Sequence, residues 1–160
     1  MSRITFRSIA LLLIVWGVAT ALSGQAAKVG AMDSAKSKLE TVPVTLGGKT
    51  VFASHANEDW SRTEGLLKWS TITEDEGMLL DFKLPGQHAI HMQGMKFPID
   101  AVWIDAQGVI KLIYEEIPPN SGQVYPSLFS CRYCLELKSG FCKKYGVKIG
   151  QTLTFGGGQR

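Results

Sequence analysis

The sequence lacks any dense cluster of lysine and arginine, which is the feature that nucleic-acid binding demands. Its 17 basic and 14 acidic residues leave a formal net charge of +3. Arg3 and Arg7 near the amino end supply two of these charges, and without them the net charge is +1. Lys143-Lys144 is only a pair, as is common at a solvated helix end. Nucleic acid is therefore not an expected partner.

Motifs that mark a common reaction class are also missing. The sequence has no internal repeat, no glycine-rich phosphate loop and no Ser-His pair, so no reaction class can be argued from it. The 45% hydrophobic and 19% charged content is that of a globular protein, and 160 residues are enough for one good core. We expect one non-catalytic, monomeric domain that needs no cofactor.

The amino end has the pattern of an export signal. A stretch with two arginines precedes an apolar segment from Ile9 to Leu22, roughly 14 residues against the ~20 of a spanning helix. Gly24-x-Ala26 suits signal peptidase, so residues 1–26 are predicted to be a signal peptide and Ala27 to begin the mature chain. The alternative is an uncleaved anchor, which would be the only contact with the membrane. Either reading predicts export to the periplasm or the cell exterior.

Residues 27–41 are polar and aperiodic, which is typical of a flexible lead-in, and the folded domain is predicted to span residues 42–155. Gly47-Gly48 and Asp105–Gly108 are predicted to be turns, as is Pro85-Gly86. A long loop is expected from Pro118 to Ser130, and residues 156–160 are expected to be disordered. Alternating or continuous apolar segments predict strands at 42–46, 50–53, 77–82, 88–92, 99–105, 109–115, 132–137 and 152–155.

Two short helices complete the predicted elements. Residues 57–64 fit a helix capped by Asn57 and followed by Gly65, with Trp60 in the core, and Ser139–Tyr145 fits a second helix. Ile110, Leu112 and Tyr114 are predicted to share one strand face. The short strands follow no βαβ rhythm, so the sequence predicts a mainly β fold, a single compact antiparallel barrel or sandwich with two short helices.

The order of several blocks resembles the domain-of-unknown-function 192 family over the whole mature domain. The matching blocks are Gly65-Leu66-Leu67, Gly77-Met78-Leu79, Met92-Gln-Gly-Met95-Lys-Phe-Pro98-Ile-Asp100 with Trp103-Ile-Asp105, Gly108-Val-Ile, Leu135-Glu-Leu137-x-x-Gly140, and Gly146-Val-x-x-Gly150. The resemblance implies a small, mainly β domain, often exported in bacteria, with no established activity.

Several positions depart from the family pattern. Lys68 stands where arginine is common, His91 replaces an aromatic residue, and Gln93 replaces a basic one. The three cysteines are not usual in the family either. If family members share a site that uses the aromatic and the cation, this member has altered it.

Five residues form the predicted ligand site. His91, Met92 and Met95, with His88 nearby, are of the types that hold copper, because soft sulfur suits Cu(I); the alternative is that the methionines fill the core. Asp100 could bind a ligand or act as a general base, or could instead cap backbone N–H groups. Trp103 is expected in the core beside this site, and an exposed Trp69 could line a pocket.

The three cysteines support a separate hypothesis. Cys131-Arg-Tyr-Cys134 has redox-motif spacing but lacks the βαβ context of a thioredoxin-like site. In an oxidising compartment one disulfide is expected, either Cys134–Cys142 or Cys131–Cys142. The alternative is a metal site, holding zinc or copper, built from these cysteines and His91.

Taken together, the sequence favours an exported ligand-binding or accessory module that takes a small molecule. The alternative function is a thiol or metal site outside the cytoplasm.

Overall fold

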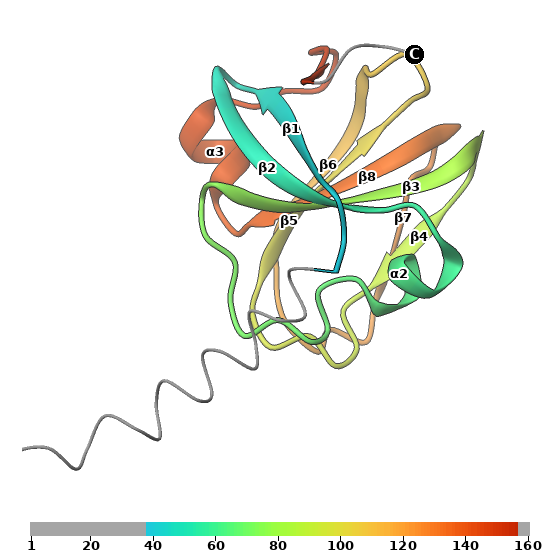
Figure 1. Ribbon diagram of the computed structural model, residues 1–160, viewed down its shortest axis with the longest axis vertical. Helices are drawn as coiled ribbons and strands as arrows, with labels where there is room; N and C mark the ends of the chain where they lie inside the picture. The colour runs from blue at the N-terminus through green and yellow to red at the C-terminus, as the bar shows by residue number, and fades with distance from the viewer. Residues whose placement is uncertain (1–37, 157–160) are drawn as a thin grey trace, which may run out of the picture.

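The computed structural model describes residues 38–156, which form one strongly curled β-sheet with smaller elements packed on both of its faces (Figure 1). The predicted signal peptide lies outside the described residues, as do most of the lead-in and of the expected tail. Within residues 38–156, no helix is both long enough and apolar enough to cross a membrane.

The large sheet has seven strands in the order β6-β5-β8-β3-β2-β1-β9, and β4 and β7 form a separate pair. The strands are β1 (Thr41–Leu46), β2 (Lys49–Ala56), β3 (Glu76–Gly86), β4 (Ala89–His91), β5 (Ile99–Ile104), β6 (Ile110–Ile117), β7 (Val124–Pro126), β8 (Cys131–Lys138) and β9 (Thr154–Phe155). The helices are α2 (Asp59–Glu64) and α3 (Phe141–Tyr145). The predicted mainly β class with two short helices is confirmed.

The carboxyl-terminal segment links the two edges of the curled sheet. β9 pairs with β1, while the residues just before it reach β6 through an isolated bridge between Val109 and Thr152. The N–H of Gly150 also donates to the carbonyl of Ile110. This segment gives the sheet its barrel-like closure, because it is hydrogen-bonded at both edges.

Two apolar cores lie on opposite faces of the sheet, as the alternation along β3 and β5 requires. Leu79 and Val102 point to one face, where they pack with Phe141 and Cys142 of α3. Met78 and Trp103 point to the other face, where α2, β4 and the loops cover them. This second face holds the cavity described below.

The structure corrects three predicted features of the sheet. β2 and β3 pair in parallel, so the segment containing α2 is a crossover between parallel strands. β3 continues through Pro85-Gly86 instead of turning there. β7 lies inside the loop predicted from Pro118 to Ser130 and pairs with β4.

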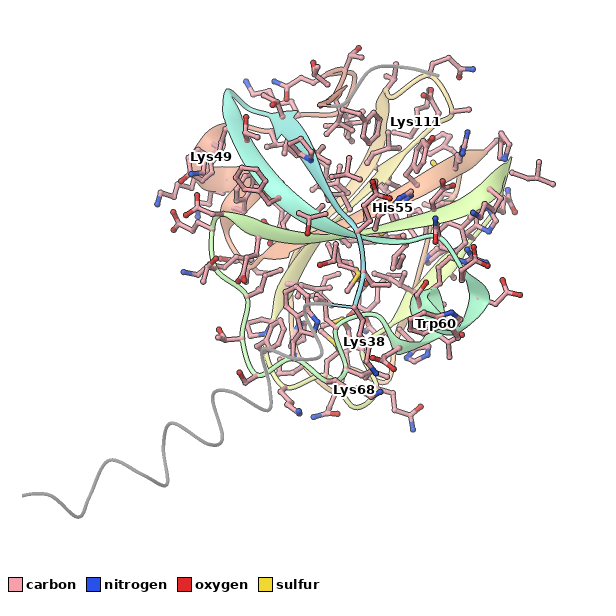
Figure 2. All side chains as sticks on the ribbon, viewed as in Figure 1. Lys38, Lys49, His55, Trp60, Lys68 and Lys111 are labelled. Atoms are coloured by element: carbon pink, nitrogen blue, oxygen red, sulfur yellow. The ribbon has the colours of Figure 1, made fainter. Side chains whose placement is uncertain are left out.

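Details of side-chain placement were also mispredicted. An irregular register beside Lys111 puts Ile110 in one core and Leu112 against the other, so these residues do not share a face. Glu58, not Asn57, caps α2, in a capping box with Ser61. Trp60 is not a core residue: it projects from α2 and is 55% exposed (Figure 2).

Candidate functional site

The predicted site residues fall into different environments. His91 is exposed on β4, whereas Met92 and Met95 are buried, as are Asp100 and Trp103 on β5. Only His91 and Met95 line the cavity beside α2.

Asp100 links its own strand, β5, to β6 and to the start of α3 by accepting hydrogen bonds from their backbone. Its Oδ1 accepts hydrogen bonds from the N–H of Glu116 (2.8 Å) and of Gly140 (3.0 Å), and its Oδ2 accepts one from the N–H of Cys142 (2.9 Å). A buried carboxylate that satisfies the amino end of α3 is a structural element, because helix starts leave N–H groups without partners. These contacts favour the capping role over that of general base.

Trp103 is fully buried, and its ring stacks on that of Phe82 with centroids 5.9 Å apart. Its indole Nε1 has no hydrogen-bond partner among the described residues. Trp69 is buried in the same core cluster, so it is not the exposed aromatic residue considered for a pocket.

The three cysteines are free, buried thiols, so the structure holds neither expected disulfide. Cys131 and Cys134 belong to the core cluster on the α2 face, whereas Cys142 belongs to the cluster on the opposite face. The sheet therefore separates Cys142 from both proposed partners. Burial raises the pKa of all three thiols, which disfavours the thiolate that metal binding needs. Among residues 38–156, no group of three histidine, cysteine or acidic side chains could hold a metal.

A cavity of about 360 Å³ lies between α2, the turn after it, β3 and β4. Polar and apolar surface contribute about equally to its walls, and the polar residues come from α2, from β4 (His91) and from β8 (Glu136). The lining residues include Arg62, Glu64, Gly65, Leu66, Leu67, Leu80, Phe82, Ile90, His91, Met95 and Glu136.

Glu136 is the notable group of this cavity. It projects from β8 on the same face as Cys134, opposite to its neighbours Leu135 and Leu137, and it is only 7% exposed. Its Oε2 has no hydrogen-bond partner among the described residues. Burial raises the pKa of Glu136 from 4.5 to about 7, since removal from water disfavours the charged form.

Gly65 brings the backbone close to this carboxyl group. It ends α2 with φ +44°, a conformation that side chains rarely adopt, and a Cβ built on it would lie 3.9 Å from Oε2 of Glu136. The residues after it, Leu66 and Leu67, form part of the cavity wall.

Arg62 lies in the wall but is bonded to other groups. Its Nη1 donates to the carbonyl of Asp81 at 2.7 Å, its Nη2 contacts the carboxylate of Asp59, and its guanidinium carbon lies 5.8 Å from the centroid of the Phe82 ring. The bond to Asp81 and the contact with Phe82 join α2 to β3.

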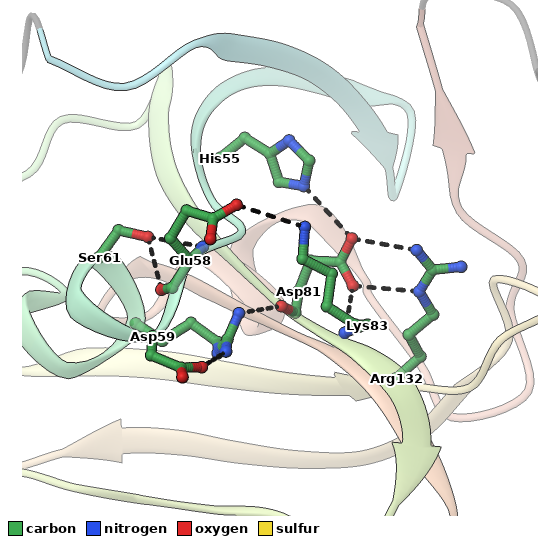
Figure 3. Close-up of polar contacts among 8 residues, drawn as sticks. His55, Glu58, Asp59, Ser61, Asp81, Lys83 and Arg132 are labelled. Atoms are coloured by element: carbon green, nitrogen blue, oxygen red, sulfur yellow. Dashed lines mark hydrogen bonds and ion pairs between the residues drawn. The ribbon is translucent and has the colours of Figure 1, made fainter.

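The other side of the same β3 segment carries a second polar cluster. Asp81 accepts hydrogen bonds from Arg132 Nε (3.0 Å) and Nη2 (3.1 Å) and from the N–H of Lys83 (2.8 Å), with His55 Nε2 at 3.5 Å (Figure 3). Burial alone raises the pKa of Asp81, but these bonds and charges hold it below its usual value. Unlike Glu136, this carboxylate is satisfied, so the cluster fixes β2, β3 and β8 together.

Sequence reasoning found part of this site. Gly65-Leu66-Leu67 and Leu135-Glu-Leu137 are blocks that carry the family resemblance, and the structure brings the first block and Glu136 of the second to the same cavity as Met95. Glu136 was missed as a site residue. The available signal was its position at the centre of an apolar strand, where an acid on the same face as Cys134 must be buried.

Comparisons with known proteins agree with the fold. A family model described as DUF192, Uncharacterized ACR, matches residues 42–155. A solved structure of a proposed transcription regulator from Sinorhizobium meliloti has a TM-score of 0.70 and 29% identity, covering 73% of this chain and 95% of that one. A protein of unknown function from Novosphingobium aromaticivorans has a TM-score of 0.71 and 21% identity, covering 74% and 87%. No curated protein matches the chain.

Proposed function

The chain belongs to the DUF192 family, and because that description gives no activity, we propose from the cavity itself that this is a non-catalytic module that binds a small molecule beside Glu136. The carrying observation is the buried carboxyl group of Glu136, whose Oε2 lacks a partner among the described residues, in a cavity of about 360 Å³. A volume of roughly 300–1,000 Å³ is typical of small-ligand pockets.

The location is part of the same proposal. The arginines, apolar segment and small residues of positions 1–26 support export, so the ligand would be met in the periplasm or outside the cell. The description of the Sinorhizobium meliloti structure concerns that protein, and the sequence of this one offers no basic cluster for DNA.

Ligand-induced stabilisation tests the proposal, because a molecule that binds only the native state raises the melting temperature. The screen contains sugars, small carboxylic acids, small amines and Cu(I). A matched pair of variants locates the binding: Ala89→Trp places a bulky side chain in the cavity wall, and Ala106→Trp places it in an exposed turn.

A ligand of this cavity stabilises the unmodified protein and Ala106→Trp but not Ala89→Trp. A ligand that stabilises all three proteins equally binds elsewhere and contradicts the proposed site. If no class stabilises the unmodified protein, the binding function itself is wrong.

A further inference from the structure

The charges around the cavity are almost all paired within the protein. Among the lining residues, Asp59 contacts Arg62, and Glu64 accepts a hydrogen bond from Lys68 at 2.6 Å. These pairs leave little net charge at the rim. One charged or ionisable lining residue, Glu136 of β8, has no such partner among the described residues.

Glu136 is the exception. No ion pair links it to Arg62 in the described structure, and the Arg62 guanidinium is directed to the carbonyl of Asp81 and to Asp59. A buried acceptor without a partner costs free energy, and a ligand donor placed there would remove that cost. A ligand donor can approach from the cavity, since Glu136 is among the residues that line it.

We propose, resting on the binding function proposed above, that the ligand is an organic cation: a protonated amine whose ammonium group bonds the carboxyl group of Glu136 and whose short apolar body lies among Leu67, Phe82 and Met95. A cation is favoured over a neutral alcohol because a bond between two charged groups in a water-poor site is stronger than one between neutral groups. It is favoured over an anion because the cationic side chain of the lining, Arg62, already has a carboxylate partner in Asp59.

The ionisation of Glu136 gives this proposal a pH signature. The titratable groups around it are Arg62 and Glu64 of the α2 wall, His91 of β4 and Cys134 of its own strand. With a pKa of about 7 in the free protein, Glu136 must lose a proton to pair with ammonium. Affinity for an amine should therefore fall by about tenfold per pH unit below pH 7, and binding at pH 6 should release about one proton.

Isothermal titration calorimetry with three ligands of similar size tests the proposal: benzylamine, benzyl alcohol and benzoate. Measurements at pH 6 in buffers of different ionisation enthalpy count the protons released. We expect benzylamine to bind at least tenfold more tightly than the other two, with release of about one proton.

The variant Glu136→Gln should lose at least tenfold in benzylamine affinity and all of the proton release, while Glu115→Gln, at an exposed acid of β6 outside the cavity lining, should change affinity less than threefold. Since the proton count is made on the unmodified protein, the test stands even if Glu136→Gln fails to fold. If benzyl alcohol or benzoate binds more tightly than benzylamine, the proposal of a cationic ligand is wrong, while the proposed binding function stands. Absence of binding by all three, together with no response in the wider screen, overturns both.

Discussion

Because Glu136 ionises at an unusually high pH, the free energy of unfolding should depend on pH in a particular way. The carboxyl group is only 7% exposed, and burial raises its pKa from 4.5 to about 7. Below pH 4.5 it is protonated in both the folded and the unfolded chain, so it imposes no penalty. Between pH 4.5 and 7 the unfolded chain loses the proton and the folded protein keeps it, so the free energy of unfolding falls as the pH rises.

The size of this loss follows from the two pKa values. At about 1.4 kcal/mol for each tenfold change, the interval from 4.5 to about 7 corresponds to about 3 kcal/mol. The variant Glu136→Gln has an uncharged amide in place of the carboxyl group. Because an amide does not titrate, the variant does not lose this unfolding free energy as the pH rises. Its free energy of unfolding, relative to the unmodified protein, should therefore rise by about 3 kcal/mol between pH 4.5 and pH 8.

Urea denaturation at half-unit pH steps measures this difference. The subtraction removes the contributions of other groups, including Asp81, whose lowered pKa acts at more acid pH. Glu115→Gln is the matched control, since Glu115 is an exposed acid on β6 of the same sheet. A difference for Glu136→Gln that stays constant with pH, or that falls as the pH rises, would refute the burial argument.

Other residues give simpler predictions. Asp100→Ala should destabilise the fold by about 3 kcal/mol or more, because three backbone N–H groups lose a charged acceptor; thermal or urea melting measures this, and an unchanged stability would contradict the structural role. Gly65→Ala should cost about 2 kcal/mol of unfolding free energy, since φ +44° strains any residue with a Cβ, and a near-neutral effect in the same melts would be contrary evidence. Cys131, Cys134 and Cys142 should resist a thiol reagent in the native protein and all react in urea without reductant; a count of one thiol would mean that a disulfide forms.

The strands were the most predictable part of this fold. Alternation across Val42, Val44 and Leu46 with Gly47-Gly48 after them predicted a hairpin, and β1 and β2 pair antiparallel as expected. The parallel pairing of β2 with β3 could not be predicted in this way, because the periodicity of a strand records which face is buried and not which strand lies beside it.

Short helices carry too little pattern to orient them. α2 has six residues, fewer than two turns, so its apolar side cannot be determined from spacing, and Ser61 is buried where Trp60 was expected. The expected disulfide was wrong for a similar reason, because the spacing of the cysteines in the sequence does not show on which face of the sheet each one lies. Cys134 and Cys142 are close in sequence, yet they lie on opposite faces of the sheet.

The cavity was only partly visible in the sequence for a related reason. His91 and Met95 were identified by residue type, which suggested metal chemistry. Glu136 was passed over because a single acid in a strand is usually at the surface. Its position in an apolar strand was the available signal, and the structure accounts for the burial: β8 lies between β3 and β5, and Gly65 lies close to the carboxyl group.

Glu136 is proposed as the ligand-binding group of the cavity, and its carboxyl carbon reports on this claim directly. Carbon-13 NMR of the free protein across pH 4 to 9 should show a Glu136 titration midpoint near 7, which moves to lower pH when benzylamine is present at saturation. A midpoint near the ordinary 4.5 that benzylamine leaves unchanged would contradict the claim.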